Sequence, residues 1–246
     1  MKNIKLGIYG DSYGVKNENR YTSWVDIVAK QLGVPYNNYC KSASPLFYSY
    51  TQFLETNTQH DIVIFLVTLP YRYTKSITLD VTGKREHYIS GIHNIEYLIK
   101  RHTNLTDADK KLLNSLKNWF WIMDEDFFKV AQKLIVDDII ARRPDTVIVP
   151  CFYESLTSDQ YENFGLVGHD HFYHLTELQC RSLDLPMNRY HDYAENLDIM
   201  NGHLTPELNN IVGNLIYNRI NNGTWSEFPT DLIEHEFTYE EYYKLL

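Results

Sequence analysis

The order of apolar and polar positions along the chain predicts strands that alternate with helices. Short apolar segments bounded by turn residues are typical of strands in a sheet, and they occupy residues 4–9, 34–40, 61–69 and 145–151. Helical spacing of apolar residues marks 21–32, 44–54, 106–143 and a long segment after Thr205-Pro206. This alternation predicts an α/β fold with a mostly parallel sheet and helices on both faces.

Local signals predict where several of these helices begin and end. Gly33 is a suitable C-cap for the first helix, and Ser44 is a suitable N-cap with Pro45 at the first helical position. Within 106–143 we expect a break near Asp124, whose carboxylate would cap the second part. The apolar stripe of that second part is Phe127, Phe128, Ala131, Leu134, Ile135 and Ile139.

Two segments differ from the alternating pattern. Residues 70–104 contain an alternating stretch and a candidate turn at Thr82-Gly83-Lys84, which predicts a hairpin in an insertion over one end of the sheet. After Gly223 the chain is acidic and aromatic, so we expect this tail to dock on its own domain or on a neighbour. We therefore predict a domain at 1–223, with an insertion at about 70–104, and a tail at 224–246.

Composition and charge exclude several classes of protein. The chain is 43% hydrophobic and 22% charged, which are globular values, and no apolar run approaches the ~20 residues of a membrane span. The net charge of −9 argues against a nucleic-acid binder, and the pairs Lys110-Lys111 and Arg142-Arg143 are typical of solvated helix faces. Three widely spaced cysteines suggest a reducing compartment, and the first residues lack the apolar segment of a signal peptide.

The first candidate for chemistry is Gly10-Asp11-Ser12, which follows the first predicted strand. Ligands of parallel α/β sheets bind outside the carboxyl ends of the strands. There the Ser12 hydroxyl could act as a nucleophile while its own N–H helps to bind an oxyanion, and Asp11 could satisfy backbone donors of the turn. The alternative reading is a serine that only caps a helix.

A serine nucleophile needs a base, and His203 has the most suitable setting among the ten histidines. It lies in the predicted loop before the last helix, from which it can reach over the strand ends. Another dense group, His169-Asp170-His171 with His174, lacks a second cluster at a recognisable metal spacing. We therefore predict no metal site, and we interpret that group as a polar patch at the active-site mouth.

Gly10-Asp11-Ser12 after the first strand, with His203 before the last helix, resembles the SGNH (GDSL) hydrolases. This resemblance implies a three-layer α/β/α, flavodoxin-like fold and hydrolysis of acyl esters, often acetyl groups on carbohydrates. Residues 38–44 fall where the family's second block lies after strand two. The segments 46–50 and 67–72 are similar to a divergent subgroup that bacteriophages often encode.

The chain departs from the family pattern at three positions. Ala43 replaces the second-block glycine and can still donate its backbone N–H to an oxyanion. Leu69 stands where an oxyanion-donating asparagine is expected, and loss of one such donor typically costs ~10²–10³ in rate. Met200 stands where an aspartate would orient the histidine. The candidates to compensate are Arg72 for the missing donor and either Asp198 or Asn201 for the missing carboxylate.

The resemblance thus implies a serine esterase that deacylates a carbohydrate or small ester through a Ser12–His203 dyad. It implies no cofactor, and the charge and apolar runs described above predict no nucleic-acid and no membrane partner. The alternative is a non-catalytic binding or virion-structural protein that keeps the fold, with self-association or virion contacts through the tail. The expected location is cytoplasmic or virion-associated.

Overall fold

The computed structural model describes residues 4–15, 22–42, 44–68, 75–80, 86–89, 92–122, 125–151 and 204–225. The chain divides into two compact units, one made of residues 1–15 and 33–162 and the other of residues 16–32 and 163–246. No helix within the described ranges combines the length and the apolar character needed to cross a bilayer.

The first unit contains a four-stranded parallel sheet in the order β2-β1-β3-β6. Its strands are β1 (Leu6–Tyr9), β2 (Tyr36–Asn38), β3 (Ile62–Val67) and β6 (Val147–Pro150). In register, Leu6 lies opposite Tyr36 on one side and Ile62 on the other. This is the beginning of the flavodoxin-like order, in which the strand order reverses between β1 and β3. The predicted α/β class with a parallel sheet is confirmed.

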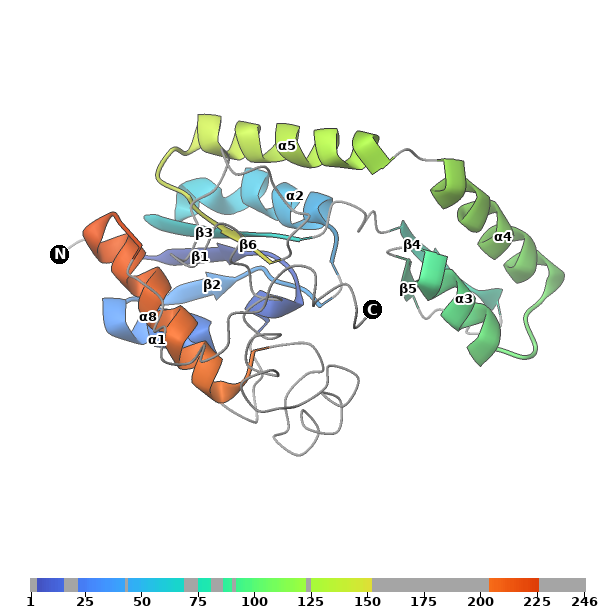
Figure 1. Cartoon of the computed structure of the whole chain (residues 1–246), viewed down its shortest axis with the longest axis horizontal. Helices are drawn as coiled ribbons and strands as arrows, with labels where there is room; N and C mark the ends of the chain where they lie inside the picture. Colours follow the sequence, from blue (N-terminus) through green and yellow to red (C-terminus); the bar gives the residue numbers. More distant parts are fainter. Residues whose placement is uncertain are drawn as a thin grey trace, which may run out of the picture. The chain divides into compact units, whose positions relative to one another are not determined.

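Two helices of the same unit, α2 (Leu46–Thr56) and α5 (Glu125–Arg142), lie on one side of this sheet (Figure 1). They pack on it through a cluster of buried apolar side chains that includes Tyr9, Phe53, Phe65, Val136 and Ile139. The tyrosine and phenylalanine rings meet edge-on or stacked, with the Tyr9 and Phe53 centroids 5.7 Å apart. Of β3, this cluster contains Val63, Phe65 and Val67. Ile64 and Leu66 alternate with them on the other face and are also buried, so burial on both faces explains the nearly continuous apolar run.

The second unit contains α1 (Trp24–Leu32) and α8 (Pro206–Asn222), which pack against each other. Asn209, buried in α8, accepts a hydrogen bond from the Trp24 backbone N–H at 2.8 Å. The predicted start of α8 and end of α1 are confirmed, because the Thr205 hydroxyl accepts from the Leu208 N–H at 3.3 Å and Gly33 has a φ of 66°. Helix α1 begins at Trp24, later than the predicted residue 21, and the Ser23 hydroxyl accepts from the Asp26 N–H at 3.3 Å.

The segment after β3 forms a smaller core of its own within the first unit. Its elements are the antiparallel strands β4 (Lys75–Thr78) and β5 (Glu86–Ile89) and the helices α3 (Ile92–Arg101) and α4 (Asp107–Ile122). Its buried residues are Ile77, Leu79, Ile95, Leu98, Leu105, Leu113 and Leu116. The predicted hairpin is therefore present, with its turn residues 82–84 outside the described residues, and this core also includes α4, beyond residue 104.

The start of α2 differs from the prediction. Its N-cap is Pro45, without a side-chain cap, so Ser44 is not the N-cap and Pro45 is not the first helical residue. The reason is that the Ser44 hydroxyl donates to the Gly10 carbonyl at 3.1 Å instead of accepting from the helix. The break in 106–143 is confirmed by the separation of α4 from α5, and Asp124 lies outside the described residues.

The predicted apolar stripe of α5 is wrong at two positions. Phe128, Ile135 and Ile139 are buried, but Phe127 and Leu134 are 53% and 62% exposed. Seven residues apart, these two side chains share the opposite side of the helix. Helix α5 therefore has two apolar faces, and only one of them packs on the sheet.

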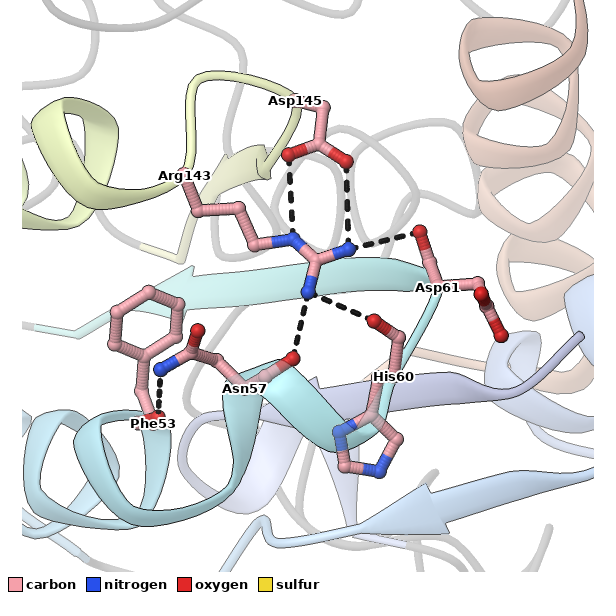
Figure 2. Close-up of polar contacts among 6 residues, drawn as sticks. All are labelled: Phe53, Asn57, His60, Asp61, Arg143 and Asp145. Carbon is pink, nitrogen blue, oxygen red and sulfur yellow. Dashed lines mark hydrogen bonds and ion pairs between the residues drawn. The ribbon is translucent and has the colours of Figure 1, made fainter.

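Arg143, at the end of α5, was expected on a solvated face but is a structural residue (Figure 2). Its guanidinium donates to the carbonyls of Asn57, His60 and Asp61 at 2.6–2.8 Å, and it pairs with Asp145 at 3.2 Å. These carbonyls belong to the turn that joins α2 to β3. Arg143 thereby fixes the amino ends of β3 and β6 against each other.

Candidate active site

Ser12 lies just beyond the carboxyl end of β1, at the point where the strand order reverses. It begins a single 3₁₀ turn, Ser12–Gly14, whose N-cap is Asp11. The strand must be closely packed here, because a Cβ at Gly10 would lie 2.5 Å from Leu66 Cβ and one at Gly14 would overlap Cys40 Sγ. Glycine on both sides of Ser12 is thus required by the approach of β3 and of the segment after β2.

Asp11 is fully buried, and its carboxylate fixes the turn that carries Ser12. Oδ1 accepts from the Tyr13 backbone N–H at 3.1 Å, and Oδ2 accepts from the Thr68 hydroxyl at 2.7 Å. The Cys151 thiol also donates to Oδ1, at 3.8 Å. Because Thr68 follows β3 and Cys151 follows β6, Asp11 ties the ends of three neighbouring strands together.

A further buried residue, Gln132 of α5, supports this arrangement from the helix layer. Its side-chain amide donates to the Thr68 carbonyl at 2.6 Å. Sequence reasoning missed both residues. Thr68 had one usable signal, its place at the carboxyl end of a buried strand. Gln132 had another, a polar residue between Phe128 and Ile135 on the apolar face of a helix.

The segment after β2 is held beside Ser12 through the Gly10 carbonyl. This oxygen accepts from the Lys41 backbone N–H at 3.2 Å and from the Ser44 hydroxyl at 3.1 Å. Asn38, at the end of β2, donates from its side chain to the Gly14 carbonyl at 2.7 Å. The segment after β2 therefore lies next to the turn that carries Ser12.

The Ser12 hydroxyl differs from the polar groups around it. The residue is 7% exposed, and its carbonyl accepts from the Val15 N–H at 3.2 Å. Across the described ranges, no hydrogen bond engages the Ser12 side chain. The alternative interpretation of Ser12 is a serine that only caps a helix. In the structure the residue that caps the turn is Asp11, not Ser12.

Besides the Cys151 thiol, the Cys40 thiol also lies near this turn, beside Gly14. Burial raises the pKa of the Cys40 thiol well above its usual range, and the nearby Asp11 carboxylate raises this pKa further. The thiolate is the reactive form of cysteine, so Cys40 stays a neutral and unreactive thiol at neutral pH.

Of the predicted site residues, the structure describes Ser12 and Asp11 and brings them together with residues that sequence reasoning missed. The predicted base and the predicted oxyanion, substrate and supporting residues lie outside the described residues: His203, Ala43, Arg72, Asp198 and Asn201. The same holds for Leu69, Met200 and the histidine group at 169–174.

Comparison with known proteins gives structural likeness only. No family model matches the chain, and no curated protein matches it. A solved structure from Parabacteroides merdae, named as a GDSL-like lipase, is 14% identical and aligns over 91% of this chain and 97% of its own, with a TM-score of 0.37. Another, from Desulfitobacterium hafniense and named as a lipolytic protein of the G-D-S-L family, is 11% identical over 88% of this chain and 99% of its own, with a TM-score of 0.36. At these values the likenesses carry no argument about function.

Proposed function

We propose that this protein is a serine ester hydrolase of the SGNH type, with Ser12 as nucleophile and His203 as general base. The observation that carries the proposal is the setting of Ser12. Its uncommitted hydroxyl follows the strand at which the sheet order reverses, in a turn held by the buried Asp11 carboxylate. This is the position at which open α/β sheets bind their ligands.

The proposed reaction proceeds through an acyl-enzyme. Ser12 Oγ attacks the ester carbonyl carbon while His203 takes the hydroxyl proton, and the backbone N–H groups of Ser12 and Ala43 hold the oxyanion. The intermediate collapses, the C–O bond to the alcohol breaks, and His203 returns the proton to the alcohol. Water then hydrolyses the acyl-serine by the same steps, which gives the acid and restores the Ser12 hydroxyl.

The substrate class we propose is a carbohydrate or small acyl ester. The enzyme is expected to be slow, because Leu69 cannot donate a hydrogen bond and Met200 cannot orient the imidazole. In this proposal Arg72 offsets the missing donor, and either Asp198 or Asn201 supports His203. Esters with good leaving groups, such as p-nitrophenyl acetate, are the suitable first substrates.

Leu69 and Met200 also support a second candidate, a binding or virion-structural protein with the same fold. Two family residues that stabilise the transition state are replaced by side chains that cannot do so. The two candidates differ in one property, the reactivity of the Ser12 hydroxyl.

A fluorophosphonate probe tests that property, because it labels activated serines covalently. We expect stoichiometric labelling at Ser12, no labelling of Ser12→Ala, and loss of labelling in His203→Ala. Ser115→Ala removes a serine that is exposed on α4 and serves as the matched control, so it should be labelled like the wild type. Labelling at another serine, or none over hours at neutral pH in a folded protein, would favour the binding protein.

A further inference from the structure

The outer side of α2 and α5 carries five large apolar side chains that the fold does not bury. Phe127, Val130 and Leu134 of α5 are 53–62% exposed, and Phe47 and Leu54 of α2 are 45% and 41% exposed. The three residues of α5 are spaced i, i+3, i+7, which places them on one stripe opposite the buried face. We call these five residues the outer patch.

The two parts of the outer patch are joined by a hydrogen bond between the helices. The Tyr50 hydroxyl of α2 donates to Asp138 of α5 at 2.5 Å. Tyr50 is three residues after Phe47 and four before Leu54, while Asp138 is four after Leu134. Side chains at these spacings are neighbours on a helix surface, so both apolar sets flank the same junction.

An oppositely charged pair of side chains lies beside the patch on α5. Lys133 and Asp137 lie one turn apart, both about half exposed, and their Nζ and Oδ2 atoms are 3.3 Å apart. A two-fold axis beside residue 135 would place Lys133 of each copy opposite Asp137 of the other. A surface of this kind is complementary to itself, which is the requirement of an isologous dimer interface.

We propose that the outer patch binds a second copy of this chain, with the two α5 helices antiparallel about that axis. Leu134 of each copy then lies near the centre, beside Phe47 of the other. Helices α2 and α5 run in the same direction, and Tyr50 is bonded to Asp138. Leu54 and Arg142, each four residues further on, therefore lie at the same level. In the proposed register Arg142 faces position 128 of the other copy. Phe127 of one copy thereby covers Leu54 of the other.

Sedimentation equilibrium of the full chain tests the proposal, with circular dichroism to confirm folding. We expect a wild-type dimer, and Leu134→Glu should weaken dimerisation roughly 30-fold or more because it buries a charge at the centre. Ile99→Glu, at another exposed apolar residue on α3, should leave the dimer intact. A monomeric wild type at high concentration overturns the proposal, and so does a dimer that Leu134→Glu does not weaken.

A charge exchange tests the antiparallel register itself. Lys133→Asp and Asp137→Lys should each weaken their own dimers about tenfold, because like charges then face each other. Mixed together, these two variants should form a heterodimer, since each presents the charge that the other lacks. Failure to pair on mixing, with wild-type dimers present, overturns the register. If the protein is a monomer and removal of residues 226–246 increases hydrogen exchange at the outer patch, the tail rather than a second copy covers the patch.

Discussion

At the amino end of the sheet the Arg143 guanidinium is fully bonded, and an unbonded hydroxyl there, that of Thr146, is buried; at the carboxyl end the unbonded hydroxyl is that of Ser12. All three guanidinium nitrogens of Arg143 have partners, namely three backbone carbonyls and the Asp145 carboxylate (Figure 2). At the other end the Asp11 carboxylate is equally well bonded, but the bonds position a neighbouring Ser12 hydroxyl that has no partner among the described residues.

The buried His60, just before β3, belongs to another group of fully bonded side chains at the amino end of the sheet. Thr56 donates its hydroxyl to the Gln52 carbonyl at 2.7 Å, so it must accept from Tyr9, which lies 2.9 Å away. The Tyr9 oxygen then accepts from His60 Nδ1 at 3.1 Å, and His60 Nε2 accepts from Asn37 at 3.0 Å. A neutral imidazole completes this chain of bonds, and burial raises the pKa of Tyr9 to about 12.

The difference between the two ends separates structural from chemical roles. A buried polar group whose bonding capacity is used by the protein contributes to the fold and leaves nothing for a ligand. An unbonded hydroxyl at the carboxyl ends of the strands lies where open α/β sheets bind their ligands. The following predictions test whether stability depends on the amino end and reactivity on the carboxyl end.

Arg143→Ala should have the largest effect on stability. It leaves three carbonyls and Asp145 without their charged donor, so we expect a loss of about 3 kcal/mol or more in the free energy of unfolding. Chemical denaturation measures it. Arg142→Ala, which breaks only an exposed pair with Asp138, should cost much less. Fluorophosphonate labelling of the folded Arg143 variant should match the wild type, and a loss of labelling would break the separation.

Asp11→Asn should have the largest effect on reactivity after the nucleophile itself. The amide cannot accept from both Thr68 and Tyr13 as the carboxylate does, so the Ser12 turn loses its position, and we expect a ~10²-fold slower labelling rate. Thr68→Val should act in the same direction, with Thr68→Ser restoring the rate. Asp145→Asn, the same change at the amino end, is the control, and equal effects of the two substitutions would contradict the comparison.

Leu69→Asn together with Met200→Asp should raise kcat on p-nitrophenyl acetate by ~10-fold or more, because the pair restores an oxyanion donor and a carboxylate for His203. The unfolding free energy is measured beside the rate. A double variant that folds and is as inert as Ser12→Ala would sink the esterase and favour the binding protein.

The smallest effect concerns pH. Burial lowers the pKa of His60, so the unfolded chain takes up the proton first as the pH falls. Stability is therefore full above the unfolded value of about 6.5 and declines below it until the lower pKa of the folded state is reached. His60→Gln should flatten this decline in thermal melts between neutral and acid pH. An unchanged slope in His60→Gln would show that other groups cause it.

The sequence predicts the features that local patterns encode and misses those that depend on distant pairs. Strands such as β3 are evident from their apolar runs, and Ser12 follows from its place after β1. The hydrogen bond from Gln132 to the Thr68 carbonyl joins residues 64 positions apart, so no local pattern predicts it. Likewise the sequence around Ser44 is typical of an N-cap, but in the structure the Ser44 hydroxyl donates to the distant Gly10 carbonyl instead. The two apolar faces of α5 cannot be ranked by periodicity alone, because each has helical spacing.

The most direct test of the central claim is to trap an acyl group on Ser12. The wild type is mixed with p-nitrophenyl acetate and quenched during the first turnover, and the acetylated peptide is identified by mass spectrometry. The account predicts a burst of p-nitrophenol that matches the enzyme concentration, with the acetyl group on Ser12 and none in Ser12→Ala. A burst with the acetyl group on another residue, or turnover that Ser12→Ala retains, would contradict it.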